Sequence, residues 1–405
     1  MKPLGKRPRL AAIITEYRKW SHAQHIIDRF LWGYGWNGRH HYPLADVVSM
    51  YVDQRPESDL SRDREERFPS LTSYDSIHDA LTLGGNELAV DGVLLIAEHG
   101  RYPRNEKQQT LYPRYEFFQQ ITQIFRDSGR AVPVFNDKHL SWRWDWAVEM
   151  VETAKELDFA FMAGSSLPVT RRIPPVELPL GAEVEEAMCV GVGGIDGYDI
   201  HCLESIQCMV ERRRGGETGA VAIQALQGDA VWDLMAKGSW ADGGWDPRLF
   251  EACLCRSHTL SQAHERIYNH AYPSPAEMRQ LVKEAPPVAY RVEYADGLKA
   301  TMLLVEGLVH DITVAARLKG KEKPLSTLMY LHPRNLCNFF SPLCYAAEQM
   351  FLTGHPTYPV ERTLLTTGLT EAGVESLHQG QKRLETPHLN VAYSPMDHST
   401  FWSDA

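Results

Sequence analysis

One stretch near the start of the chain decides its fold: Leu10-Ala11-Ala12-Ile13-Ile14-Thr15-Glu16-Tyr17-Arg18-Lys19-Trp20. Its five apolar residues predict a short buried strand, and residues 21–31 have the pattern of a helix. Strand, tight turn and helix open a dinucleotide-binding βαβ unit, whose turn normally carries glycines so that the backbone can approach a pyrophosphate. Residues 15–20 supply bulky and acidic side chains instead. We therefore expect this scaffold with a degenerate, glycine-free phosphate loop.

The alternation of strands and helices continues through the first third of the chain. Strands are expected at residues 46–53, 90–97, 131–135 and 159–163, and helices at 73–81, 112–128 and 144–157. Strands separated by helices predict a parallel sheet with helices on both faces. This is an α/β fold, and we assign residues 1–165 to a Rossmann-like domain.

The pattern changes after a cluster of prolines at positions 168, 174, 175 and 179. Residues 218–226, 288–294 and 299–307 alternate with period two, which is typical of antiparallel strands with one covered face. Residues 166–405 are expected to form an α+β substrate and oligomerisation domain with a mostly antiparallel, open sheet. Its helices at 342–353 and 360–375 should return to the seam between the domains.

Composition excludes several classes of protein. The net charge of −10 argues against a nucleic-acid partner. No run of about 18 apolar residues is present to span a membrane. The seven cysteines show no CxxC spacing, so we expect reduced thiols in a cytoplasmic protein.

The C-terminal part of the chain has the pattern of a helix, a turn and a second helix, in the stretches Glu348-Gln349-Met350-Phe351-Leu352-Thr353-Gly354-His355-Pro356 and Pro359-Val360-Glu361-Arg362-Thr363-Leu364-Leu365-Thr366-Thr367-Gly368-Leu369-Thr370-Glu371-Ala372. With these stretches as its most specific part, the chain resembles the Gfo/Idh/MocA group of sugar oxidoreductases, which includes glucose–fructose oxidoreductase and inositol dehydrogenase. The likeness covers nearly the whole chain. It implies a two-domain fold, hydride exchange between NAD(P) and a sugar carbon, and pairing of subunits through the outer face of the second sheet.

Two motifs of the family have counterparts here. Asp137-Lys138-His139 stands where the family has Glu-Lys-Pro, and Lys138 matches the lysine that reaches nicotinamide and substrate. The box Asp196-Gly197-Tyr198-Asp199-Ile200-His201 stands where the family has Asp-x-Gly-x-His, and His201 matches the catalytic histidine. The resemblance thus implies Lys138, His201, Asp196 and Asp199 as catalytic residues, with the register of the two acids open.

The residues near the expected phosphates disfavour the cofactor. Glu16 lies in the turn, and Glu98-His99 replaces the family's neutral Thr-Pro. Two carboxylates facing a pyrophosphate would cost several kcal/mol unless cations such as Arg18 offset them. Asp53 suits a ribose hydroxyl, or simply caps a turn. If NAD(P) is retained, the expected contacts are Glu16, Tyr17, Arg18 and Asp53.

Chemistry without a hydride carrier is therefore our leading hypothesis. A histidine can take the proton beside a carbonyl, and a lysine can stabilise the enolate. These two groups are sufficient for β-elimination from a keto-sugar or 3-keto-glycoside, which is a lyase reaction. The alternatives are an NAD(P)-dependent sugar or inositol oxidoreductase with an unusual loop, and a non-catalytic sugar-binding protein. The candidate substrate contacts are Glu98, His99, Asp137, Arg171, Arg172 and Tyr198; the two arginines could equally bridge the domains.

A divalent metal is a further possibility, because an ion would stabilise an enolate. The candidate ligands are His99, Asp137, His139 and His201, with Glu98 and the pair His40-His41 also considered. His22 and His25, three apart on one helix face, are interpreted as ordinary helix residues.

Overall fold

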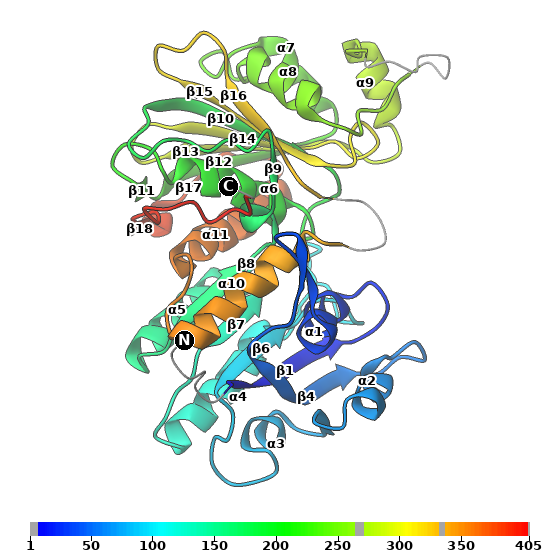
Figure 1. Cartoon of the computed structure of the whole chain (residues 1–405). Helices are drawn as coiled ribbons and strands as arrows, with labels where there is room; N and C mark the ends of the chain where they lie inside the picture. Colours follow the sequence, from blue (N-terminus) through cyan, green and yellow to red (C-terminus); the bar gives the residue numbers. More distant parts are fainter. Residues whose placement is uncertain (1–6, 264–270, 332–336, 404–405) are drawn as a thin grey trace.

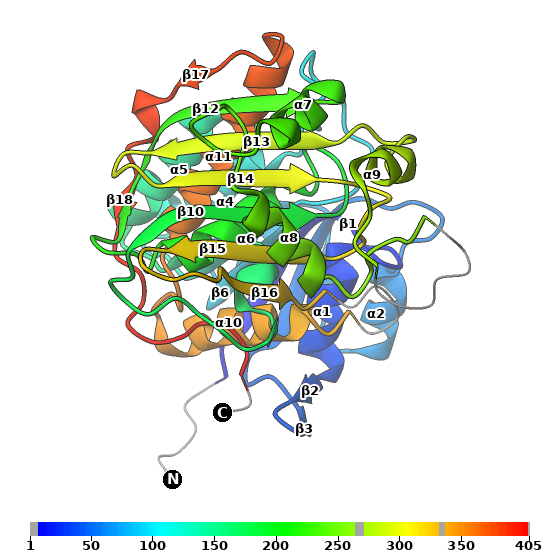
Figure 2. The same cartoon turned by 90° about the horizontal axis from the view of Figure 1, so that it is seen from above.

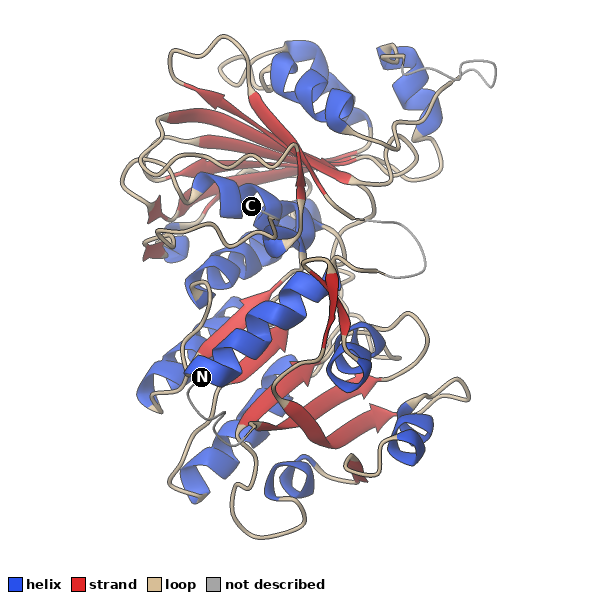
Figure 3. Cartoon of the chain, in the orientation of Figure 1, coloured by secondary structure: helices blue, strands red, loops and turns tan. Residues whose placement is uncertain are grey.

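The computed structural model describes residues 7–263, 271–331 and 337–403, and it contains two large sheets with helices between them (Figures 1 and 3). The first sheet is six-stranded and wholly parallel, in the order β5-β4-β1-β6-β7-β8. Its strands are β1 (Arg9–Glu16), β4 (Asp46–Gln54), β5 (Thr72–Tyr74), β6 (Gly92–Ile96), β7 (Val134–Asp137) and β8 (Phe161–Gly164). The expected Rossmann-like sheet is confirmed.

Both faces of this sheet are buried, because successive side chains of β1 point to opposite faces and residues 10–14 are all apolar. Leu10, Ala12 and Ile14 face one way, toward α1 (His22–Trp32) and α10 (Phe340–Thr353). Ala11 and Ile13 face the other, toward α3 (Ile77–Thr82), α4 (Arg114–Asp127) and α5 (Trp144–Glu156). The short helix α2 (Ser61–Arg67) lies beyond β4. Since α10 comes from late in the chain, the first sheet depends on the C-terminal third for part of its core.

The second sheet has eight strands in the order β17-β12-β13-β14-β10-β15-β16-β9. Each neighbouring pair is antiparallel except β10 and β14, so the expected mostly antiparallel open sheet is confirmed. Its strands are β9 (Arg172–Ile173), β10 (Val184–Gly191), β12 (Ala220–Gln227), β13 (Val288–Tyr294), β14 (Lys299–Leu304), β15 (Ile312–Leu318), β16 (Leu325–Met329) and β17 (Leu384–Glu385).

Helices of the chain itself pack on both faces of the second sheet. On the inner face α6 (Asp199–Val210) and α11 (Val360–His378) separate it from the first sheet. On the outer face lie α7 (Asp229–Lys237), α8 (Pro247–Arg256) and α9 (Pro275–Leu281), as Figure 2 shows. Trp245 and Leu249 pack there against Met188 and Leu303.

The resemblance implies a subunit interface on the outer face of the second sheet, the face that helices α7, α8 and α9 cover. Beyond the helices, the outer face carries ion pairs, including Lys299 with Glu293 and Arg317 with Glu185. An interface between subunits needs an apolar centre, and here the chain's own helices bury the apolar part of the face. Pairing of subunits through this side of the molecule stays a prediction, and the helices α7 to α9 would take part in it.

Two pairs of short strands lie outside the two large sheets. A hairpin of β2 (Tyr34–Trp36) and β3 (Arg39–His41) projects beside α10, and β11 (Glu217–Thr218) pairs with β18 (Ala392–Tyr393) of the C-terminal tail. Short 3₁₀ turns occur at Leu167–Val169 and Pro387–Leu389. None of the helices in the described part of the chain is both long and apolar enough to cross a membrane.

Candidate functional site

The candidate site lies where β6 and β7 end and α6 begins. Glu98 follows β6, Lys138 directly follows β7, and His201 is in the first turn of α6. The Lys138 ammonium donates to the carbonyl of Gly197, just before α6, at 3.0 Å. Ligands of doubly wound sheets bind at the carboxyl ends of the strands, so the position suits a functional site.

A buried charge cluster forms its floor. Lys138 Nζ lies 2.9 Å from Glu98 Oε1, and the other carboxylate oxygen of Glu98 pairs with Arg114. Burial alone would raise the pKa of Glu98, but the charges of Lys138 and Arg114 bring it well below its usual range. Burial opposes the charge on Lys138 as well, yet Glu98 raises its pKa. Lys138 is therefore a charged donor inside the protein.

His139 is also buried, and its Nε2 lies 3.2 Å from Arg114 Nη1. Burial and then the Arg114 charge lower the pKa of His139 well below its usual value. A neutral imidazole beside a guanidinium serves as an acceptor for it. His139 thus accepts a hydrogen bond from Arg114 and helps to hold that side chain in place.

Two expected site residues contact a histidine that the sequence analysis interpreted as structural. Asp137, 1% exposed, accepts a hydrogen bond from His22 Nδ1 at 2.6 Å. The rings of His22 and His99 are 5.2 Å apart, and burial lowers the pKa of His99 to about 4. His22 was missed because Asp137 lies 115 residues away in the chain.

His201 is held by Ser165, a second residue that sequence reasoning missed. Its Nδ1 lies 2.6 Å from Ser165 Oγ, and the Ser165 amide donates to Glu204 at 2.6 Å. Burial, then Lys138, lowers the pKa of His201 well below its usual value. Tyr198, 41% exposed, lies edge-on to the His201 ring at 5.7 Å.

The two acids of the box have different surroundings. Asp196 accepts the amide of Thr110 at 2.6 Å and stays partly exposed, with its pKa raised by burial. Asp199 is fully buried, accepts from Tyr290 at 3.2 Å, and has its pKa raised by burial to about 6. Asp199 therefore points into the second domain's core, and Asp196 is the acid closer to solvent.

The turn that should cradle a pyrophosphate is filled by side chains. Tyr17 is fully buried, and its hydroxyl donates to Asp28 at 2.5 Å. Glu16 pairs with Arg18 at 2.5 Å. Where a dinucleotide fold has glycines, this turn therefore carries a buried tyrosine and a carboxylate paired with a cation, and the disfavoured binding of NAD(P) stays a prediction.

Backbone donors at the start of α1 are also engaged. Ser21 Oγ accepts the amide of Gln24 at 3.2 Å, and the amide of His22 points to His99 Nδ1 at 3.5 Å. These are the amides that bind phosphate in a dinucleotide fold. Asp53, the candidate ribose contact, already accepts the hydroxyls of Tyr51 at 2.8 Å and Tyr102 at 2.6 Å. The residues present do not fit NAD(P) in the usual position.

Arg171 and Arg172 lie away from the cluster. Arg171 stacks on Trp402 at 3.8 Å and Arg172 on Phe401 at 4.3 Å, so both fasten the C-terminal tail to the chain between the sheets. Of the two roles left open by the sequence, the bridging role agrees with these contacts, and neither arginine faces Lys138 in the contacts of the described residues.

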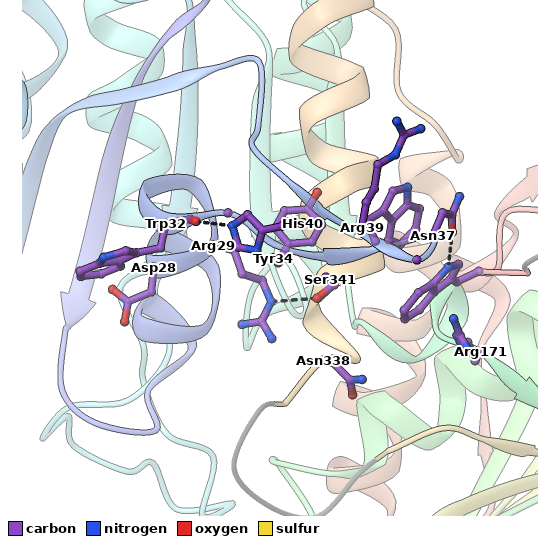
Figure 4. Close-up of a pocket in the computed structure, with 15 residues that line it drawn as sticks. Asp28, Arg29, Trp32, Tyr34, Asn37, Arg39, His40, Arg171, Asn338 and Ser341 are labelled. Carbon is purple, nitrogen blue, oxygen red and sulfur yellow. Dashed lines mark hydrogen bonds between the residues drawn. The ribbon is translucent and has the colours of Figure 1, made fainter.

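A separate cavity of about 700 Å³ lies beside the hairpin (Figure 4). Trp32, Asn37, Arg171 and Asn338 are among the residues that line it. Asn37 accepts a hydrogen bond from the indole of Trp402 at 2.8 Å. Figure 4 shows the His40 bond to the carbonyl of Trp32. The hairpin turn is Asn37-Gly38, both with positive φ, a strong hairpin signal that the sequence analysis overlooked.

The expected metal ligands are not gathered into one site. Within the described residues, no three His, Cys, Asp or Glu side chains come together in a way that could hold a metal ion. Asp137 is bonded to His22 and His139 to Arg114, while His41 binds Glu348 at 2.7 Å, on α10. The arrangement gives the metal hypothesis no support.

Comparison with known proteins gives likenesses in structure only. No family model matches the sequence, and no curated protein sequence matches it. GenD2 from gentamicin A biosynthesis, in complex with NAD, is similar over 94% of this chain and 97% of its own, with TM-score 0.57 and 12% identity. Myo-inositol dehydrogenase from Lactobacillus casei, in complex with NAD(H) and myo-inositol, covers 96% and 98%, with TM-score 0.53 and 10% identity.

The super-repressor mutant of Gal80p from Saccharomyces cerevisiae is also similar, over 96% of this chain and 100% of its own, with TM-score 0.50 and 9% identity. At these identities the likeness establishes the fold and leaves activity open. The Gfo/Idh/MocA two-domain fold, which the sequence resemblance implies, is confirmed.

Proposed function

We propose that this protein with the Gfo/Idh/MocA fold is an enzyme that moves protons on a sugar or cyclitol ketone at the cluster of Lys138 and His201. One observation carries the proposal: the charged, buried Lys138 bonds the carbonyl of Gly197, just before the helix α6 that carries the neutral His201, while the chain itself engages the amide of His22 at the start of α1. A carbonyl placed between the two would find two donors.

The chemistry follows from those donors. An imidazole of the site removes the proton beside the carbonyl, and the electron pair moves toward the carbonyl oxygen. The Lys138 ammonium stabilises the oxyanion, because Glu98 keeps it charged and fixed. A leaving group on the β-carbon then departs, which gives the lyase reaction on a keto-sugar or 3-keto-glycoside.

An NAD(P)-dependent sugar or inositol oxidoreductase is the second candidate, and the comparisons favour it over the lyase. Both GenD2 and the Lactobacillus casei enzyme are described as complexes with NAD or NAD(H). In this chain a phosphate bound at the start of α1 would require His99 to leave the amide of His22. A non-catalytic sugar-binding protein is the third candidate; the similar Gal80p chain is described as a super-repressor mutant and not as an enzyme.

One experiment separates the three. The purified protein is titrated with NADH and NADPH by fluorescence, then offered inositols and sugars with NAD⁺ or NADP⁺, and keto-cyclitols and 3-keto-glycosides without nucleotide. Turnover of keto substrates alone, lost in Lys138→Met, supports the proposal. Micromolar nucleotide binding with reduction of NAD⁺ or NADP⁺ would replace it by the oxidoreductase, and sugar binding without turnover would indicate the third candidate.

Location and assembly are proposals of the same kind. All seven cysteines are free thiols, which suits a reducing compartment such as the cytoplasm. A homo-oligomer paired through the second sheet is still expected from the resemblance.

A further inference from the structure

The proposed function leaves open which imidazole takes the proton, and the following inference rests on that function. We propose that His22, held by the buried carboxylate of Asp137, is the base, and that His201, held by Ser165, is a neutral hydrogen-bond donor to the carbonyl oxygen. The hydrogen bonds of the two rings carry the argument, because each fixes where its imidazole holds its proton.

The tautomer of His22 follows from its partner. The carboxylate of Asp137 can only accept hydrogen bonds, so the 2.6 Å contact places a proton on His22 Nδ1. The lone pair is then on Nε2. The ring is held by the edge of Phe340 at 5.0 Å and by His99, while the side chain keeps 15% of its surface exposed. A carboxylate behind an oriented imidazole is the arrangement that makes histidine a base.

The tautomer of His201 is the opposite. Ser165 Oγ accepts the amide of Leu167 at 3.1 Å, so its single proton is free to point to His201 Nδ1 at 2.6 Å. The proton of the neutral ring is then on Nε2. Burial and then the Lys138 ammonium lower the pKa of His201, so this ring stays neutral and donates a hydrogen bond without giving up its proton.

The other nearby histidines are engaged differently. His99 Nδ1 faces the amide of His22, and His139 faces Arg114. His25 stacks on Phe340 at 4.8 Å. Among these rings, His22 alone pairs its Nδ1 with a buried carboxylate in the contacts of the described residues.

The step balances with these groups alone. The α-carbon–hydrogen bond breaks, its proton passes to His22 Nε2, and its electron pair forms the enolate. The oxyanion is held by Lys138 and by His201 Nε2–H. When the β-carbon–oxygen bond breaks, its electron pair leaves with the oxygen, which takes the proton back from His22.

The first test needs no substrate. A proton NMR spectrum of the whole protein should contain a resonance far downfield from His22 Nδ1–H, present in wild type and in His25→Gln. It should vanish in His22→Gln and in Asp137→Asn. With ¹⁵N-labelled histidine, His201 should be protonated on Nε2, and Ser165→Ala should relax this preference while Ser165→Thr keeps it. A His22 unprotonated on Nδ1, or a His201 protonated on Nδ1, overturns the inference.

The second test is exchange of the α-proton of a keto-cyclitol or 3-keto-glycoside in D₂O. His22→Gln should lower the exchange rate by about 100-fold or more, as expected for loss of a general base. His25→Gln, on the same helix, should leave it near wild type. If the exchange rate is unchanged in His22→Gln but lost in Lys138→Met, the base lies elsewhere. This result overturns the assignment of His22 and leaves the proposed function standing. No exchange by wild type with any keto substrate overturns the proposed function, and the base with it.

Discussion

Substituting Glu98 by glutamine should destabilise the protein strongly, because one carboxylate neutralises two buried cations. Glu98 is 8% exposed, Lys138 4% and Arg114 0%. The glutamine keeps the shape of the side chain but leaves both cations without an opposite charge. Breaking a buried pair by removing one partner costs about 3–5 kcal/mol. We expect a loss of that size in the free energy of unfolding, measured by urea denaturation at pH 7.

Two further variants separate charge from packing. Lys138→Met leaves the pair of Glu98 and Arg114 intact, so its cost should be much smaller. The double variant should be more stable than the sum of the single losses predicts, by about 1 kcal/mol or more, because it buries one uncompensated cation rather than two. Glu385→Gln, which removes an exposed partner of Arg383, should change stability by less than about 1 kcal/mol.

The reasoning fails if Glu98→Gln stays within about 1 kcal/mol of wild type, which is the scale of an exposed pair. Lys138 would then be solvated and would not need Glu98 to stay charged. The electrostatic part of the proposed mechanism would lose its basis, whatever the activity of the variant.

Three other changes have outcomes fixed by single contacts. Burial raises the pKa of Glu204 to about 7. The stability that its protonated carboxyl contributes is therefore present below about pH 4.5 and is lost as the pH rises to 7. Glu204→Gln should remove about 3 kcal/mol of this pH dependence, and urea denaturation at pH 8 should find the variant more stable than wild type. Gly164→Ala, at φ +128° with its new carbon 2.7 Å from Glu204 and Thr363, should cost about 2 kcal/mol or more, whereas Gly129→Ala, at φ +60° in open space, should cost about 1 kcal/mol. Trp402→Ala removes the stack on Trp36 and the contact with Arg171 and should cost about 1–3 kcal/mol by the same measurement; an unchanged value would mean that the tail does not fasten the seam.

The sheets could be predicted from sequence because their signals are local. The continuous apolar runs of β1 and β6, as expected for strands buried on both faces, are visible in a few residues each. The strand expected at 131–135 begins only at Val134, where pairing with Val93 of β6 starts. The β-propensity of these residues predicts that a strand exists, and pairing with β6 sets the residue at which it begins.

The site could be predicted only where it follows those strands. Lys138 and Glu98 come at strand ends, so the topology brings them together. His22 and Arg114 each acquire their role from a partner that is distant in sequence, which no local pattern reveals. Arg172 shows the reverse: it stands near the expected site in sequence, but its contacts are with Glu177 and the tail. The covering helices were missed although two of them have clear start signals: Asp246 before a proline at α8, and a capping box of Ser274 and Glu277 at α9.

The closed phosphate cradle and the proposed base depend on the same helix start. In a dinucleotide fold the first residues of this helix turn their amides to a pyrophosphate. Here His22, the first residue of α1, directs its ring to Asp137 at the end of β7 and its amide to His99. A pyrophosphate at this point would have to displace His99 from that amide and would place negative charge beside Asp137. Nucleotide binding and the His22–Asp137 pair should therefore exclude each other. NADH added at millimolar concentration should leave the downfield His22 resonance in place; its disappearance on titration would show that the turn opens and that the oxidoreductase is the better description.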